Sequence, residues 1–431
     1  MSAPAGKTAK VKALTVAIVA VIVIAVAAAV AYFILLRPAP PAPALPPKEE
    51  IVFGYVDHFT GPLASGTFLT STSLVRTIVE DYNAMGGLYV PEYGKKLRIK
   101  VIEYDDRSDV ETLIRLTEKC MVEEKVDFMF PPWSTGSQFA VSPLYEKYGY
   151  PQIGINMGSD QIVQAIKRGE IKWLFPALCQ PSFIVGHVKK FLEYAIPKAG
   201  ASGIGIIYIA DLHGIEFSSA FFRELSLWGQ YPILVYESYP MGVTDLSPLI
   251  KKLKEEGVDV LVACTYPEDA ILILRQMREL DYNPKIMFLG PASSIFGLYA
   301  SALGVDVMQG VMGYHGIAIN FKMVPKAKEL TMRWKDIVGH PVYGIAIYYG
   351  GLEMLFKAVE KCGLDRVKVR EALAKEAFET VCGLSRFNLV DCYLEFDALG
   401  WVAQWQGDLP VVVWPPEKAE AEFIVKPPWP K

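Results

Sequence analysis

The chain has 431 residues, of which 52% are hydrophobic and 21% charged, and its formal net charge is -4. This composition supports a packed core and excludes an intrinsically disordered chain. Lysine and arginine form no long basic run, which excludes a nucleic-acid-binding stripe. At ~100–200 residues per domain, the length beyond the N-terminus predicts two domains.

The N-terminus predicts a membrane anchor. Lys7, Lys10 and Lys12 precede an uncharged apolar run at residues 13–36. About 20 apolar residues cross a bilayer as a helix, and flanking lysines stay on the cytoplasmic side. We therefore expect a cytoplasmic tail at residues 1–12, a single span in the cell membrane at 13–36, and the globular part outside the cell. A cleaved signal peptide is the alternative, although its apolar core is usually only ~7–15 residues long.

A Pro- and Ala-rich linker is predicted at residues 37–49. Such a tract favours extended polyproline II and acts as a semi-rigid spacer. It would hold the globular part away from the membrane surface.

From residue 51 the hydrophobic pattern alternates between strand and helix. Strands are predicted at 51–56, 97–104, 126–130 and 152–155, separated by helices at 67–83, 110–124 and 138–147. The pattern then restarts, with strands at 204–209, 233–239, 258–264 and 285–288 and helices at 215–228, 246–256 and 268–280. This alternation predicts an α/β protein with two lobes built on parallel sheets. Ligands bind such sheets beyond the carboxyl ends of the strands.

The loops after the first set of strands are rich in Ser, Thr, Asn and Gly. Such residues cap helices, let a ligand approach the backbone, and present unpaired amides to an anion such as a carboxylate. Helix capping without a ligand explains any single loop equally well, whereas three such loops on one sheet edge favour a binding site. The ligand-binding residues predicted here are Ser65, Gly66, Trp133, Ser134, Thr135, Asn156, Gly158 and Ser159.

The second set of strands supplies the opposite side of the predicted cleft. Its candidate ligand-binding residues are Asp211, His213, Thr265, Tyr266 and Ser293. Trp133, His213 and Tyr266 would be the bulky walls. Ordinary packing is the alternative for Trp133 and Tyr266, whereas His213 lies at a predicted loop tip, where packing explains it less well.

Signatures of enzymes and of metal sites are absent from the sequence. There is no HExxH, no GxSxG and no GxxxxGK[ST] motif, and the histidines lack metal-ligand spacing. We therefore expect no enzymatic activity, no metal and no cofactor. None of the six cysteines forms a CxxC pair. We predict a disulfide between Cys382 and Cys392, with buried free thiols as the alternative.

Several short motifs resemble one family, in order and spacing. They are Thr60-Gly-Pro62, Asn83 with Gly86-Gly87, Tyr104-Asp-Asp106 and Ser134-Thr-Gly136, with looser similarity up to Gly400. Together they resemble the leucine/isoleucine/valine class of type I extracellular solute-binding proteins of ABC transporters. The resemblance implies two Rossmann-like lobes that close on a ligand and then dock on an ABC permease in the membrane.

The same resemblance implies three hinge crossings between the lobes, near residues 175–181, 311–316 and 381–384. Lobe 1 would comprise residues 50–177 and 316–382, and lobe 2 residues 178–315 and 383–431.

The resemblance also implies roles for individual residues. Ser134 and Thr135 would hold a carboxylate, Asn156 and Gly158 would contact the carboxylate and an amino group, and His213 with Thr265 or Tyr266 would lie on the far lobe. The acidic residue that pairs with the ligand's ammonium in this family falls on Ala292.

The alanine side chain at position 292 cannot compensate the charge of a buried ammonium group, so this position affects which ligands can bind. Asp57, Asp160 or Asp211 could replace the missing acid if geometry allows. We expect capture of an amino acid or related small carboxylate, with a small amide or aromatic acid as the alternative.

Two other classes of function stay open on the sequence. The fold also serves as a sensor, which would need a separate signalling partner. A hydrolase with His213 as base and Asp211 as its orienting acid would need those side chains to meet, which their positions in a loop do not require.

Overall fold

The computed structural model describes residues 6–35, 46–178, 180–314, 316 and 318–431. The chain divides into two compact units, Met1–Pro47 and Lys48–Lys431. In the first unit the apolar run forms helix α1 (Gly6–Leu35). Its segment Lys10–Tyr32 is long and apolar enough to cross a membrane. Most of the predicted linker lies outside the described residues.

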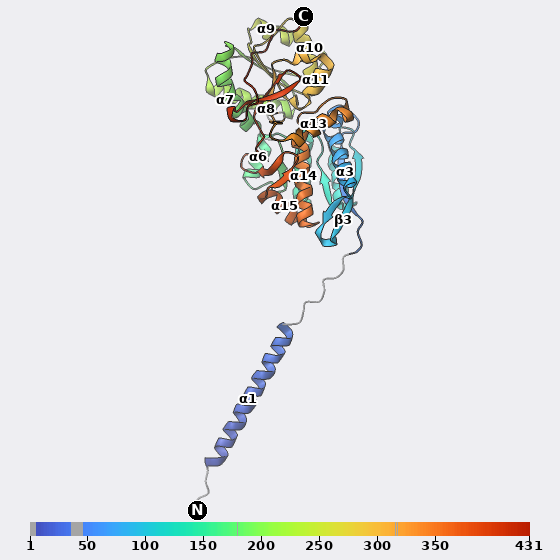
Figure 1. Ribbon diagram of the computed structural model, residues 1–431, viewed down its shortest axis with the longest axis vertical. Coiled ribbons are helices and arrows are strands. Elements are labelled where there is room, and N and C mark those ends of the chain that lie inside the picture. Colours follow the sequence, from blue (N-terminus) through green and yellow to red (C-terminus); the bar gives the residue numbers. More distant parts are fainter. Residues whose placement is uncertain (1–5, 36–45, 179, 315, 317) are drawn as a thin grey trace, which may run out of the picture. The chain divides into compact units, whose positions relative to one another are not determined.

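The second unit contains two α/β lobes, and Figure 1 shows their helices in two groups. In lobe 1 a four-stranded sheet has the order β2-β3-β1-β4, and β5 and β6 form a separate parallel pair. β1 pairs in parallel with β3 and β4, and is buried because it lies inside the sheet. The strands are β1 (Glu50–Asp57), β2 (Leu88–Val90), β3 (Lys95–Asp105), β4 (Phe128–Phe130), β5 (Gln152–Gly154) and β6 (Leu174–Pro176).

Helices join these strands, as the alternating pattern predicts. Three of these helices begin with a capping side chain, for example Asp109, whose carboxylate accepts from the backbone N–H of Thr112 at 2.8 Å. The lobe 1 helices are α2 (Ala64–Thr67), α3 (Ser73–Ala84), α4 (Val110–Val122), α5 (Thr135–Tyr148) and α6 (Asp160–Lys167), with a π-helical turn η1 (Phe68–Thr72) between α2 and α3.

Lobe 2 is built on a seven-stranded sheet of order β16-β15-β11-β10-β9-β7-β8. Strands β7 to β11 are parallel, whereas β15 and β16 run antiparallel at one edge. The strands are β7 (Ile204–Ile209), β8 (Ile233–Tyr239), β9 (Val260–Thr265), β10 (Ile286–Pro291), β11 (Val311–Tyr314), β15 (Val402–Gln406) and β16 (Leu409–Trp414). The helices are α7 (Pro181–Ala199), α8 (Leu212–Trp228), α9 (Ser247–Glu255), α10 (Pro267–Glu279), α11 (Phe296–Leu303) and α12 (Val305–Met308), with a 3-10 turn η3 (Ala292–Ile295).

The chain then returns to lobe 1. α13 (Pro325–Val338), α14 (Ile345–Cys362) and α15 (Arg366–Lys375) are followed by a sheet of β12 (Phe378–Thr380), β13 (Gly383–Asn388) and β14 (Tyr393–Glu395). β13 contacts α14 and α15, and β14 contacts β6. We therefore propose that the third crossing follows Glu395 rather than lying near residues 381–384, and the other two crossings remain predictions.

The predicted disulfide is wrong, because Cys382 and Cys392 are both free and buried. They lie before the start of β13 and after its end, and a strand rises ~3.3 Å per residue. That separation is far beyond the ~7 Å between Cα atoms that a disulfide can bridge. Their thiols donate instead to the backbone carbonyls of Ala346 and Leu389.

Two helix starts differ from the prediction and affect the site. α5 begins at Thr135 rather than residue 138, and α8 begins at Leu212 rather than residue 215. His213 therefore lies in the first turn of a helix and not at a loop tip.

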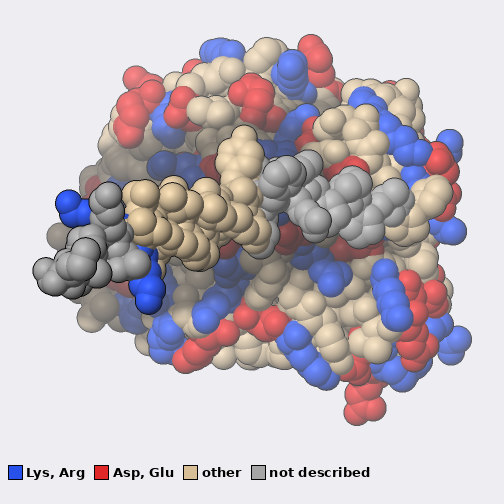
Figure 2. Space-filling view, turned by 90° about the horizontal axis from the view of Figure 1, so that it is seen from below, with Lys and Arg blue, Asp and Glu red and all other residues tan. Residues whose placement is uncertain are grey.

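On the face shown in Figure 2, lysine and arginine are interspersed with aspartate and glutamate.

Candidate functional site

A pocket lies between the strand ends of the two lobes. Its empty volume is about 600 Å³, including space open to solvent. Lobe 1 supplies Gly66, Leu69, Thr70, Trp133, Ser134, Thr135, Asn156, Gly158 and Tyr348 to its lining, and the rest is Leu178, His213, Phe217, Thr265, Tyr266, Pro267, Ser294 and Ile295.

The N-terminus of α5 forms the floor on the lobe 1 side. Ser134 is its N-cap, and the Ser134 hydroxyl accepts from the backbone N–H of Ser137 at 3.2 Å. The Thr135 hydroxyl accepts from the N–H of Gly158 at 3.4 Å, which leaves its own proton for another acceptor. A helix N-terminus favours an anion, so this floor suits a carboxylate.

Three polar atoms of the lining have no hydrogen-bond partner within the protein. They are Nδ2 of Asn156, Nε2 of His213 and Oγ1 of Thr265, and Thr265 is fully buried. Buried polar atoms are almost always hydrogen-bonded in folded proteins. Unpaired atoms that converge on one pocket therefore indicate a polar ligand.

Aromatic rings form the lobe 2 wall. His213 stacks on Tyr266 with centroids 5.0 Å apart, and Tyr266 lies 5.7 Å from Trp133 on the other lobe. Phe217, one turn after His213, extends the same wall. Burial lowers the pKa of His213 below its ordinary value, so its ring is neutral at neutral pH.

Charged side chains do not line the pocket among the residues that the structure describes. The three aspartates considered as substitutes for Ala292 are used elsewhere. Asp57 accepts from the N–H of Trp133 and the hydroxyl of Tyr55, at 2.8 and 2.6 Å. Asp160 accepts from the N–H and hydroxyl of Ser182. Asp211 accepts from the N–H of Gly214 at 2.8 Å and the hydroxyl of Tyr266 at 2.5 Å.

The structure brings most of the predicted ligand-binding residues together at the pocket, namely Gly66, Trp133, Ser134, Thr135, Asn156, Gly158, His213, Thr265 and Tyr266. Ser65 is exposed and outside the lining, and Asp211 caps α8 beneath Tyr266. Ser293 lies in η3, and its side chain is outside those that the structure describes.

Ser159 makes a contact between the lobes instead of lining the pocket. Its hydroxyl donates to Oε1 of Glu216 at 2.8 Å, and the N–H of Asp160 donates to Oε2 at 3.0 Å. Glu216 lies in α8 of lobe 2 and is buried. Its carboxylate thus caps α6 across the cleft and favours the closed arrangement of the lobes.

Sequence reasoning missed Leu69, Thr70, Leu178, Phe217, Pro267, Ser294, Ile295 and Tyr348. The spacing of Phe217 four residues after His213 on a helix was a usable signal. Tyr348 gave none, because it reaches the pocket from α14 and hydrogen-bonds Ser294 only through the tertiary fold.

The described residues contain no group of three or more His, Cys, Asp or Glu that could hold a metal ion. The hydrolase alternative requires Asp211 to orient the ring of His213. Both carboxylate oxygens of Asp211 bond to Gly214 and Tyr266, and the ring of His213 stacks on Tyr266. The hydrolase hypothesis thereby loses its acid–base pair.

Fold and site together define a two-lobed α/β protein with a ligand pocket between its lobes. A periplasmic binding protein family model matches residues 50–408, so the chain belongs to the periplasmic binding protein family. The resemblance to the leucine/isoleucine/valine class and the type I fold are confirmed.

The chain is similar to Leu/Ile/Val-binding protein homolog 7 of Brucella abortus, with 26% identity over 399 residues, which is 89% of this chain and 96% of the relative. Among solved structures it resembles the branched-chain amino acid transporter substrate binding protein LivJ from Streptococcus pneumoniae in complex with isoleucine, with a TM-score of 0.67 at 20% identity, covering 88% of this chain and 100% of that one.

It also resembles a solute binding protein of an ABC transporter from Rhodopseudomonas palustris in complex with 3,4-dihydroxy benzoic acid. The TM-score is 0.66 at 18% identity, with 88% of this chain and 99% of that one covered. These likenesses establish the fold.

Proposed function

We propose that this protein captures a small carboxylate that carries no ammonium group, as the solute-binding subunit of an ABC importer. One observation carries the proposal: the pocket is lined by neutral polar and aromatic side chains, with no charged side chain among the described residues.

The carboxylate would lie at the start of α5. The N-terminus of α5, the hydroxyl proton of Thr135 and the free Nδ2 of Asn156 offer donors on this side. Such donors bind an anion without a positively charged side chain.

An ammonium group would lack an anionic partner in the same pocket. Removing a charge from water without a counter-charge costs several kcal/mol. Neutral hydroxyls recover part of this cost, so we expect an amino acid to bind at least ~100-fold more weakly than the same acid without its amino group.

The body of the ligand would be branched aliphatic or aromatic. Leu69, Leu178 and Ile295 offer aliphatic contacts, while Trp133 and Tyr266 offer flat faces. Flat or branched groups bury apolar area against such walls.

α1 would anchor the protein in the cell membrane with the globular unit outside, and an ABC permease would receive the closed form. Support comes from the length and composition of α1 and from the family to which the chain belongs. Uptake of branched-chain amino acids is the second candidate, favoured by the names of similar proteins.

A thermal-shift screen of the full chain in detergent tests the proposal. The panel contains 4-methylpentanoate, 3-phenylpropanoate and benzoate, their amides, and leucine, isoleucine, valine and phenylalanine. At a hundredfold excess over its dissociation constant, a ligand adds ~2.7 kcal/mol of stability. Stabilisation by a carboxylate but not by the amino acids supports the proposal, and stabilisation only by amino acids contradicts it.

A further inference from the structure

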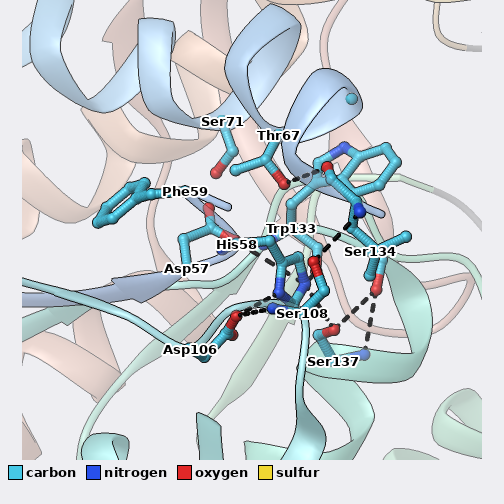
Figure 3. Close-up of polar contacts among 12 residues, drawn as sticks. Asp57, His58, Phe59, Thr67, Ser71, Asp106, Ser108, Trp133, Ser134 and Ser137 are labelled. Carbon is cyan, nitrogen blue, oxygen red and sulfur yellow. Dashed lines mark hydrogen bonds and ion pairs between the residues drawn. The ribbon is translucent and has the colours of Figure 1, made fainter. Parts of the chain in front are cut away.

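A buried cluster of charged side chains lies directly behind the pocket floor. It consists of Asp57 and His58 at the end of β1 and Asp106 in the loop after β3, and Figure 3 shows His58 between them and the residues of the α5 start. All three side chains are at most 1% exposed, and none lines the pocket.

Nδ1 of His58 faces a carboxylate, and Nε2 faces a carbonyl oxygen and a hydroxyl. Nδ1 lies 2.8 Å from Oδ1 of Asp106, and Nε2 lies 3.3 Å from the carbonyl oxygen of Trp133 and 2.9 Å from Oγ of Ser137. A neutral ring with its proton on Nδ1 could accept from the Ser137 hydroxyl at Nε2, but it would turn the same lone pair towards the carbonyl oxygen of Trp133. Oδ1 of Asp106 lies 2.8 Å from Nδ1 and Oδ1 of Asp57 lies 4.0 Å from Nε2, and these two carboxylates favour the imidazolium.

The electrostatics agree with this geometry. Burial lowers the pKa of His58, but the hydrogen bond to Asp106 and the charge of Asp57 outweigh burial and raise the pKa above its ordinary value. The facing charged groups are Asp57 and Asp106, and Tyr55 bonds to Asp57. α5 presents only the hydroxyl of Ser137 to the ring, and the segment before α3 presents the hydroxyl of Ser71 to Tyr55.

The cluster holds a strained turn of the binding loop. Ser134 has φ 77° and ψ 152°, a region almost restricted to glycine, which persists only when neighbouring contacts enforce it. Just before it, the N–H of Trp133 donates to Asp57 at 2.8 Å, and the Trp133 carbonyl faces His58. Ser134 itself donates to Oγ of Ser137, which also contacts His58.

We propose that His58 is a positioning residue of the binding site, which holds the Trp133–Ser134 turn from behind and makes carboxylate binding depend on its proton. The inference rests on the proposed function. With His58 protonated and both carboxylates ionised, the cluster carries one net negative charge. Loss of the proton leaves two buried carboxylates uncompensated behind the α5 N-terminus and replaces a donor to Trp133 by a lone pair. Both changes oppose an anion in the pocket.

The raised pKa of His58 determines how carboxylate affinity changes with pH. The pKa of His58 in the folded protein lies above the ordinary value of ~6.5, so its contribution to carboxylate affinity is complete below that raised pKa and is lost as pH rises through it. Carboxylate affinity should therefore fall towards alkaline pH, whereas the affinity of a neutral amide with the same body should not. His213 titrates below its ordinary value, outside this window.

The test uses the full chain in detergent, with 4-methylpentanoate and 4-methylpentanamide as probes, from about pH 6 to about pH 9. In the wild type we expect the dissociation constant of the carboxylate to rise at least ~5-fold across this range and that of the amide to change less than ~2-fold. H58Q should flatten the carboxylate profile, and D106N, which removes the charge of the carboxylate partner of Nδ1, should shift it to lower pH. An unchanged profile in H58Q would overturn the inference.

A second measurement needs neither a ligand nor a variant that binds. In a carbon–proton NMR spectrum of the histidine Cε1–H groups, the His58 signal can be assigned by its absence in H58Q or its shift in D106N. Its titration should give a pKa above ~6.5. A value below that overturns the inference even if no probe binds. Failure of every probe with a raised His58 value would instead count against the proposed function alone.

Discussion

Replacing Thr265 by valine should raise the stability of the ligand-free protein and lower its affinity for the ligand. Thr265 ends β9, is fully buried, and its hydroxyl has no hydrogen-bond partner in the protein. Valine has nearly the same shape, so Thr265→Val removes an unpaired polar group without leaving a cavity. Burial of an unpaired hydroxyl costs ~1–3 kcal/mol in proteins, so we expect ~1 kcal/mol of added stability, or roughly 2 °C in the midpoint.

The effect on binding should have the opposite sign. A hydroxyl that pairs with the ligand contributes ~0.5–1.5 kcal/mol, which predicts a ~2- to 10-fold loss of affinity in the valine variant. Thermal unfolding without ligand and titration calorimetry with 4-methylpentanoate measure the two effects separately.

Thr331 provides a matched control. It is fully buried in α13, its hydroxyl also lacks a partner, and it does not line the pocket. Thr331→Val should therefore stabilise the protein similarly and leave affinity unchanged. Equal affinity in Thr265→Val and wild type would refute the reasoning that the free hydroxyl serves the ligand.

Three further predictions concern the pocket, the closure and the pH dependence of stability. A Cβ on Gly66 would lie 2.4 Å from Cη2 of Trp133, so Gly66→Ala should displace that ring and reduce ligand affinity at least ~10-fold. In the control Gly186→Ala the new Cβ meets open space, and ligand affinity should be unchanged. Glu216 does not line the pocket, but its carboxylate caps α6 across the cleft. Glu216→Gln removes the charge of that cap and should therefore weaken ligand binding ~3- to 10-fold. Unchanged affinity in titration calorimetry would show that this contact does not assist closure. Burial raises the pKa of Glu353 from 4.5 to about 7, so the native protein keeps a proton that the unfolded chain releases, and stability should fall as pH rises between these values. Glu353→Gln, which keeps an acceptor for the N–H of Val381, should flatten that fall in unfolding midpoints measured across the same range.

Much of the lobe 1 side of the site could be predicted from the sequence. Ser134 and Thr135 follow a short apolar strand and precede a helix, and small polar residues at that point are helix caps whatever the ligand. The start of α5 was predicted too late because Gly136 and the small residues beside it have no apolar periodicity.

The rest of the site depended more on tertiary structure. Tyr348 reaches the pocket from a helix whose approach to η3 no local pattern encodes. Ser159 has the same type of side chain as Ser134, but Glu216, 57 residues away, determines that it joins the lobes. The antiparallel edge strands β15 and β16 pair only because a hairpin turn returns the chain, with Gly407 at φ 70°.

The charge cluster behind the pocket was visible only in part. Asp57 ends a buried strand and His58 follows it, so a position near the site was expected for Asp57. Asp106 lies 48 residues after His58, and only the pairing of β1 with β3 brings the two side chains together. Sequence alone did not show that Asp57 supports the loop rather than the ligand.

The central claim is that this pocket takes a carboxylate without an ammonium group. Its most direct test is titration calorimetry of 4-methylpentanoate against leucine, which differ only in the amino group, on the full chain at neutral pH. We predict that 4-methylpentanoate binds at least ~100-fold more tightly than leucine, because no acidic side chain lines the described pocket. Leucine binding as tightly as 4-methylpentanoate, or more tightly, would contradict the account.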